Sequence, residues 1–109
     1  MTTETKRLFT AIGIVGQFYL PDEDRAHVAA LKPGDAVALK AEPTNQFDAN
    51  AVLVTTLKGN KLGYLPKAVA PSAKLFLDSG FLINARVDDV LVNKNKNFTI
   101  TVDATRVQP

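Results

Sequence analysis

GDAVALKAEPTNQFDANAVLV, residues Gly34–Val54, places two apolar runs on either side of a polar segment. Because side chains alternate between the two faces of a strand, the apolar residues predict two strands, one around Val37 and one around Val54. The segment between them, Ala41–Val52, then predicts a long hairpin loop. A tight hairpin can be closed with a Gly and an Asn or Asp, so the surplus of polar groups raises the question of whether this loop holds something besides its own backbone.

Upstream of this hairpin, the run LFTAIGIVG, residues 8–16, is apolar on both faces toward its end and predicts a central strand. The next segment carries Pro21 and three acidic residues, which allow one short helical turn before Pro33 and Gly34 break the chain. We therefore expect residues 17–33 to be mostly a connection.

Downstream of the hairpin, the pattern changes from strand to helix. After a KGN turn, residues 61–66 predict a short strand that Pro66 ends. From Lys67 the apolar spacing becomes that of a helix, with Pro71 in its first turn and Gly80 just beyond its end. This segment should pack one apolar stripe against the sheet.

Two longer alternating patterns complete the chain. Residues 81–92 predict a strand with Val87 facing inward, and residues 97–107 predict a strand with Ile100 on its apolar side. Six short strands would leave long exposed edges in a flat sheet. The sequence therefore favours a mainly β fold, a small six-stranded OB-like β-barrel with one or two short helices. A two-layer α+β sandwich is the competing architecture.

The totals limit the class of protein. The chain has 109 residues, 46% of them hydrophobic and 22% charged, which indicates one globular domain over residues 1–109. The absence of cysteine removes disulfides, thiolate catalysis and Cys-based zinc sites, and a lone His27 cannot form a histidine cluster. A net charge of +2 permits an anionic partner without requiring one. With no apolar run long enough to span a bilayer and no secretory signal, we expect a cytoplasmic protein that does not bind membranes.

Catalytic motifs are weak in this sequence. A Ser–His–acid triad would need His27 with Ser72 or Ser79, and neither serine lies in a nucleophile-elbow motif. The chain has no phosphate-binding loop, no dinucleotide glycine fingerprint and no EF-hand spacing. We therefore expect neither an enzyme nor a cofactor, although Asp48 and Asn50 offer two oxygen ligands that would bind a hard cation weakly.

Aromatic side chains near strand ends favour a binding function instead. Phe18 and Tyr19 directly follow the first predicted strand, where a proline ends it, so one of the two rings should face outward. Packing of both rings on the barrel core is the alternative. Phe47 lies between Gln46 and Asp48 in the polar loop, where burial is hard to arrange. A hydrophobic plug under the loop is the alternative for this ring.

The loop combines an amide, a ring and a carboxylate in Asn45, Phe47 and Asp48. This set suits the end of a nucleic-acid strand, because a base stacks on the ring and the carboxylate accepts a hydrogen bond from a hydroxyl. Asx side chains also bond their own backbone, so a purely structural role is the alternative for Asp48. Tyr64 and Lys67 lie near the start of the predicted helix, where backbone N–H groups favour phosphate.

The segments IVGQFY, GDAVALKAEPTNQFDANAVLV, KLGYLPK and NFTITV, in this order, resemble the HIRAN domain from about residue 9 to residue 107. HIRAN domains occur fused to helicase-like DNA translocases in eukaryotes and as small stand-alone proteins in bacteria. The resemblance implies a modified OB-like barrel and, from the eukaryotic members, capture of the 3′-hydroxyl end of single-stranded DNA.

Carried over residue by residue, the resemblance implies that Tyr19 and Phe47 clamp the terminal base and that Asp48 meets the 3′-hydroxyl. Contacts with the last nucleotides and phosphates, or a place at the pocket, are implied for Phe18, Asn45, Tyr64, Lys67 and Phe98. The chain also departs from the translocase version. Gln17–Leu20 stands where that version has an arginine and paired tyrosines, and Tyr64 stands where it has a histidine.

Two functions follow from these patterns. The favoured one is a non-enzymatic module that binds single-stranded DNA at its 3′ end and serves DNA repair, replication or a mobile element, together with a DNA-processing protein partner. The alternative is a β-barrel adaptor that keeps the fold but binds another protein, through the acidic segment Pro21–Asp24 and the same aromatic cleft.

Overall fold

The computed structural model describes residues 5–15, 26, 30–46, 48–92 and 98–107. In this part of the chain, six strands and one helix follow one another as β1 (Thr5–Gly13), β2 (Ala36–Ala41), β3 (Val52–Thr56), β4 (Lys61–Tyr64), α2 (Ala70–Asp78), β5 (Leu82–Val92) and β6 (Phe98–Val107). The order agrees with the six strands and the single inserted helix expected from the sequence. Nearly all of the described residues outside α2 lie in strands or in the turns that join them.

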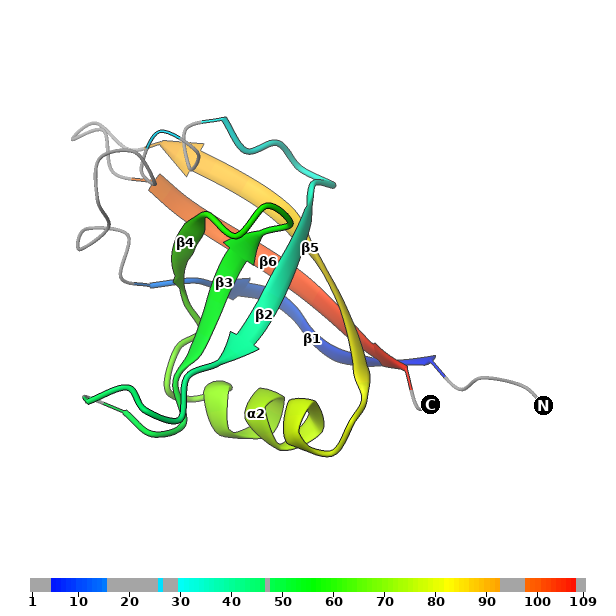
Figure 1. The fold of residues 1–109 in the computed structure, drawn as a ribbon. Helices are drawn as coiled ribbons and strands as arrows, with labels where there is room; N and C mark the ends of the chain where they lie inside the picture. Colours follow the sequence, from blue (N-terminus) through cyan, green and yellow to red (C-terminus); the bar gives the residue numbers. More distant parts are fainter. Residues whose placement is uncertain (1–4, 16–25, 27–29, 47, 93–97, 108–109) are drawn as a thin grey trace.

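The six strands form one antiparallel sheet in the order β1-β6-β5-β2-β3-β4 (Figure 1). The sheet curls until its two ends meet at one backbone bridge between Val15 and Tyr64. The N–H of Val15 donates to the carbonyl of Tyr64 at 2.8 Å, and the N–H of Tyr64 donates to the carbonyl of Val15 at 2.7 Å. The fold is therefore mainly β and of the OB-like type, as expected, and the α+β sandwich is set aside.

β1 is not the central strand that its apolar pattern predicted. It stands at one end of the strand order, and among the six strands it pairs with β6 alone. A bulge interrupts it after Phe9, where Ala11 has a φ of 51° and its N–H donates to Asp103 Oδ1 at 2.7 Å. The bulge changes the alternation. Phe9 and Ile14, which unbroken alternation would place on opposite faces, are therefore both buried.

The core lies inside the curl of the sheet. Its largest fully buried side chains come from three strands, β3, β4 and β6, and are Leu62, Ile100, Val52, Val54 and Val102. The sequence placed Val54 and Ile100 on apolar faces, and it placed Val87 facing inward, where that side chain is 2% exposed. Apolar alternation thus predicted the core correctly outside β1.

The helix α2 lies across one end of the curled sheet and contacts β2 and β3 (Figure 1). Pro71 is in its first turn and Gly80 follows it with a φ of 84°, as the sequence predicted. It begins at Ala70 because residues 67–69 form a turn. The helix has nine residues, and nowhere in the described part of the chain is there a helix long and apolar enough to cross a membrane.

The bridge that closes the sheet depends on a glycine. Gly63 has a φ of 149°, and a Cβ atom at this position would lie 2.6 Å from the carbonyl oxygen of Val15. A side chain would therefore be strained by its own backbone and would also push against a backbone atom of the opposite strand. Gly63 is the residue that allows β4 to approach the chain after β1 this closely.

We expect Gly63→Ala to lower the free energy of unfolding by about 3 kcal/mol, because backbone strain and a clash with the Val15 carbonyl add to each other. Gly59→Ala is the matched control, since Gly59 has a φ of 95° but open space around its Cα. This control should cost about 1–2 kcal/mol for the positive φ alone. Urea unfolding compares the two variants, and equal losses would show that the approach of β4 to Val15 does not require a glycine.

Candidate nucleic-acid interface

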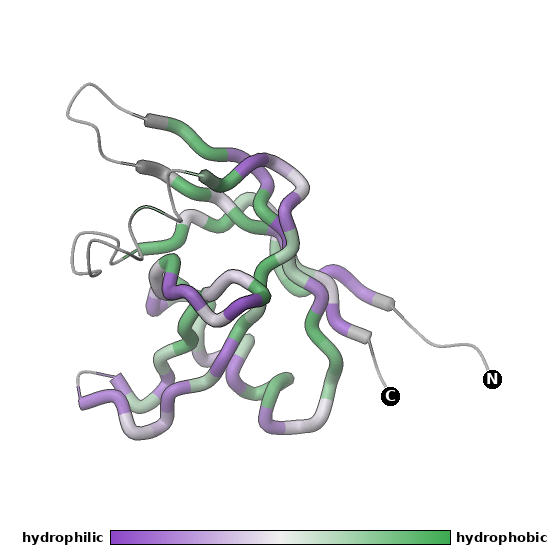
Figure 2. The backbone as a smooth tube through the Cα atoms, turned by 45° about the horizontal axis from the view of Figure 1, so that its top comes forward, coloured by the Kyte–Doolittle hydropathy of each residue, from purple (hydrophilic) through white to green (hydrophobic). Residues whose placement is uncertain are grey.

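The loop between β2 and β3 is closed by backbone hydrogen bonds at its base and within it. The N–H of Glu42 donates to the carbonyl of Ala51 at 2.9 Å, and the N–H of Asn45 donates to the carbonyl of Glu42 at 3.0 Å. The N–H of Ala51 donates to the carbonyl of Asp48 at 3.1 Å. Figure 2 shows that this loop is mostly hydrophilic, in contrast to the hydrophobic β3 that follows it. The loop is an ordered turn that carries polar side chains.

Two side chains of the loop bond to its own backbone. Asn45 Oδ1 accepts a hydrogen bond from the N–H of Asp48 at 3.1 Å, and Asp48 Oδ1 accepts one from the N–H of Asn50 at 2.9 Å. These are Asx-type contacts that stiffen a turn. The half-buried carboxylate of Asp48 uses one oxygen in this way, and no described residue donates a hydrogen bond to the other. The structural alternative for Asp48, a hydrogen bond to its own loop backbone, is therefore present. It uses one of the two carboxylate oxygens.

Tyr64, at the end of β4, is tied to this loop through Glu42. Its hydroxyl donates to Glu42 Oε1 at 2.8 Å, and Asn45 Nδ2 donates to the same oxygen at 3.2 Å. Burial, and then the hydrogen bond with Glu42 and its charge, raise the pKa of Tyr64 to about 12. The phenol is thus a permanent hydrogen-bond donor at ordinary pH. The sequence did not single out Glu42, although it stands at the start of the polar loop.

Lys67 lies exposed in the turn that leads into α2. The first turn of α2 has no acidic residue, and Val69, its N-cap, makes no capping bond through a side chain. A helix N-terminus carries partial positive charge, and Lys67 adds a full one. No ion pair joins Lys67 to any residue that the structure describes. This corner of the molecule is suited to an anion.

The structure connects three of the predicted binding residues, Asn45, Asp48 and Tyr64, through hydrogen bonds. Glu42 accepts from Asn45 and Tyr64, and Asn45 accepts from the backbone N–H of Asp48. Lys67 follows Tyr64 by three residues along the chain. The remaining predicted residues lie outside what the structure describes: Phe18, Tyr19 and Phe47 entirely, and Phe98 in its side chain. Their roles stay predictions.

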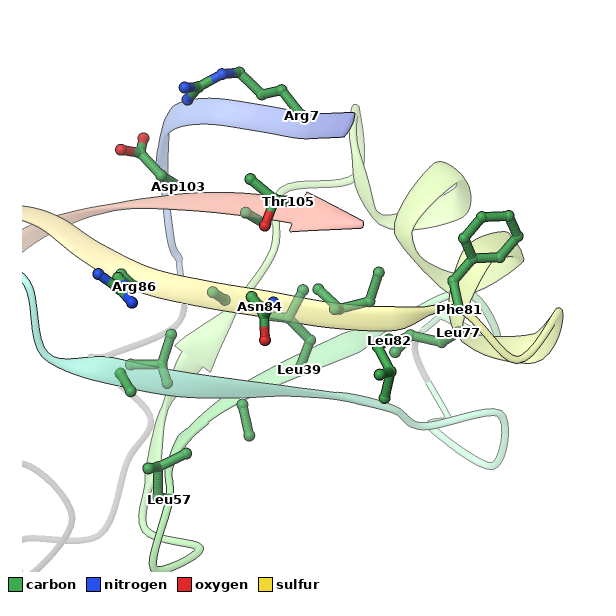
Figure 3. Close-up of a pocket in the computed structure, with 16 residues that line it drawn as sticks. Arg7, Leu39, Leu57, Leu77, Phe81, Leu82, Asn84, Arg86, Asp103 and Thr105 are labelled. Carbon is green, nitrogen blue, oxygen red and sulfur yellow. The ribbon is translucent and has the colours of Figure 1, made fainter. Parts of the chain in front are cut away.

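A separate groove of about 880 Å³ runs between β2 and β5 (Figure 3). The two strands pair only at Ala36 and Val37 and then diverge, which opens the groove. Its lining mixes apolar side chains with Arg7, Arg86 and Asp103. It contains none of the predicted binding residues, so this groove is not the predicted site. Across the described residues, no three His, Cys, Asp or Glu side chains are grouped to hold a metal ion.

Known proteins match this chain in sequence over most of its length. The family model of the HIRAN domain matches residues 10–105. The helicase-like transcription factor of Oryctolagus cuniculus is 30% identical over 82 residues, and that of Homo sapiens is 28% identical over 82 residues. Each match covers 74% of this chain and 8% of the relative. The chain therefore corresponds to a small part of these longer proteins.

Solved structures have the same fold. A crystal structure of a protein from Lactobacillus plantarum has a TM-score of 0.75 and 25% identity, with 96% of this chain and 99% of that chain covered. The crystal structure of the HIRAN domain of human HLTF has a TM-score of 0.71 and 24% identity, with 94% of this chain and 78% of that chain covered. Because the family model extends over nearly the whole chain and the fold agrees, the protein belongs to the HIRAN domain family.

Proposed function

We propose that this HIRAN domain is a non-enzymatic module that binds single-stranded DNA and that it recognises the 3′-hydroxyl end. The observation that carries the proposal is the state of Asp48. Its carboxylate is held in a stiff turn by one oxygen, while its other oxygen accepts no hydrogen bond from the described residues. A fixed, ionised carboxylate is an acceptor for a hydroxyl and repels a phosphate.

Two further residues support a nucleic-acid ligand. Asn45, bonded to the N–H of Asp48, is an amide of the kind that contacts nucleotides, and Lys67 supplies a cation at the helix N-terminus. Base stacking would come from Tyr19 and Phe47, whose placement is a prediction from the sequence. Two of the matched relatives are named helicase-like transcription factors. These names are consistent with DNA as the ligand. The predicted role in DNA repair and the predicted partner protein belong to this proposal.

The adaptor function is the second candidate from the sequence. Its acidic segment, residues 21–24, and its aromatic cleft fall on residues that the structure does not describe. The described part of the chain supports the DNA module, because one oxygen of the Asp48 carboxylate accepts no hydrogen bond from the described residues and Lys67 is exposed in the turn before α2. Fluorescence anisotropy with labelled single-stranded DNA, blunt duplex and RNA separates the candidates. Absence of binding to every nucleic acid at low salt and high micromolar protein would favour the adaptor.

We expect the protein to bind an oligonucleotide with a 3′-hydroxyl more tightly than the same oligonucleotide with a 3′-phosphate. Asp48→Asn should weaken binding to the hydroxyl end, since a charge-assisted hydrogen bond becomes a neutral one. The same variant should narrow the difference in affinity between the hydroxyl end and the phosphate end, because the repulsion between the Asp48 carboxylate and the phosphate is removed. The asparagine keeps an oxygen for the N–H of Asn50, so the turn should survive. Anisotropy titrations of both ends measure these effects.

Asp88→Asn is the matched control for this experiment. Asp88 lies exposed on β5, where its carboxylate accepts a hydrogen bond from Thr101 at 3.0 Å. The control removes one negative charge without touching the loop, so it should leave the preference for the hydroxyl end unchanged. Equal affinities of the unmutated protein for the two ends would leave Asp48 with a structural role only.

We expect Lys67→Ala to weaken binding to all single-stranded sequences alike, because a phosphate contact carries no information about the base. The slope of log affinity against log salt should become shallower by about 0.7, the value for one phosphate contact on a single strand. Lys58→Ala is the control, since Lys58 is also exposed but lies in the turn between β3 and β4. If the two variants have the same salt slope as the unmutated protein, Lys67 is not in the site.

A further inference from the structure

Glu42 connects two parts of the chain that the sequence separates by twenty-two positions. Its Oε1 accepts a hydrogen bond from the hydroxyl of Tyr64, at the end of β4, at 2.8 Å. The same oxygen accepts a hydrogen bond from Asn45 Nδ2 in the loop at 3.2 Å. The two hydrogen bonds on this oxygen therefore form a tie between the loop and the sheet.

The tie is connected, through Asn45, to Asp48, the residue that contacts the DNA end in the proposed function. Asn45 uses its Nδ2 toward Glu42 and its Oδ1 toward the N–H of Asp48, at 3.1 Å. An amide with both ends bonded cannot rotate freely. The position of Asp48 thus depends in part, through Asn45, on the side chain of Glu42, and that side chain is held by Tyr64.

The hydrogen bonds from Tyr64 and Asn45 to Glu42 have features that stabilise them. Hydrogen bonds to an ionised carboxylate are stronger than neutral ones, and both donors are only partly exposed. The raised pKa of Tyr64 keeps its hydroxyl protonated and available as a donor over the whole ordinary pH range. The backbone of Tyr64 is fixed as well, because it pairs with Val15 at the closure of the sheet.

We propose that Glu42 is a positioning residue of the DNA-end site, which holds Asn45 and Asp48 in their binding geometry by anchoring the loop to Tyr64. This inference rests on the proposed function for the ligand, while the tie itself rests on the hydrogen bonds described above. It gives Tyr64 a role different from the one the resemblance implied. Its hydroxyl orients the loop, and the contact with the nucleotide comes from the residues that the loop carries.

Three variants test the tie. Glu42→Ala removes the acceptor, Glu42→Gln keeps an oxygen without the charge, and Tyr64→Phe keeps the ring without the donor. We expect Glu42→Ala and Tyr64→Phe each to lower affinity for the 3′-hydroxyl end by about tenfold, the equivalent of one hydrogen bond to a charged group. Both variants should also narrow the difference in affinity between the 3′-hydroxyl and 3′-phosphate ends. The affinity of Glu42→Gln for the hydroxyl end should lie between those of these two variants and that of the unmutated protein.

A double variant and a spectroscopic readout distinguish positioning from general loss of stability. Glu42→Ala combined with Tyr64→Phe should weaken binding hardly more than either change alone, because both remove the same tie. In Glu42→Gln, the absorbance titration of Tyr64 should move from a pKa of about 12 toward the ordinary value of 10.0 without reaching it, since burial is the larger cause and remains. Subtracting the titration of the Tyr64→Phe protein removes the contribution of Tyr19.

NMR makes the outcome independent of DNA binding. We expect the side-chain amide of Asn45 and the backbone amides of Asp48 and Asn50 to shift in Glu42→Gln and in Tyr64→Phe. Unshifted amides, or unchanged end preference in folded Tyr64→Phe protein, would overturn the inference while the proposed function stands. If the unmutated protein binds no single-stranded DNA, the proposed function fails and with it the role of Glu42 in that site, even where the amide shifts show that the tie exists.

Discussion

The backbone bridge between Val15 and Tyr64 is the constraint on which the site depends. Without it, β1 and β4 would be the two open edges of a six-stranded sheet, and unpaired edges invite association with other chains. With it, the sheet is curled around its core and Tyr64 is fixed from both sides, by its backbone at the closure and by its hydroxyl on Glu42. Gly63 permits the approach because any side chain there would meet the Val15 carbonyl.

Closure of the sheet and the arrangement of the loop between β2 and β3 are therefore connected through one residue, Tyr64. The loop between β2 and β3 bonds to itself through Asn45 and Asp48, and it bonds to the sheet through Glu42. A loop on the surface is ordinarily mobile, and a mobile loop would lose conformational entropy when a ligand binds. In the proposed function, the hydrogen bonds order the loop before DNA binds, so the Asp48 carboxylate would meet the DNA end without that loss. The proposed function would thus account for a loop that is richer in polar groups than a hairpin requires.

Local patterns predicted most of the fold. Alternation located the strands and their buried faces, and the proline and glycine positions located α2. The central place assigned to β1 was wrong, since β1 stands at one end of the strand order. Its buried face was also affected by a bulge at Ala11, because alternation assumes an unbroken strand. The neighbours of β1 also depend on contacts between distant segments, which periodicity does not contain. The resemblance to the HIRAN domain is confirmed by the family match over residues 10–105.

The candidate site was predicted in part. Asn45, Asp48 and Tyr64 were chosen from their residue types, and they do lie in one cluster. Glu42 was missed because its role comes from a contact with Tyr64, twenty-two residues away. Its charge at the first position of a polar loop, where β2 ends, was the available signal. Phe18, Tyr19, Phe47 and the side chain of Phe98 stay predictions.

The most direct test of the central claim is an NMR titration of the isotopically labelled protein with a short single-stranded DNA that ends in a 3′-hydroxyl. The account predicts that the largest changes in amide signals fall on Asn45, Asp48 and Asn50, with smaller changes around Lys67. The same changes should be weak when the DNA ends in a 3′-phosphate. Changes confined to other surfaces, such as the groove between β2 and β5, or none at saturating DNA, would contradict the claim that this loop binds the end of a DNA strand.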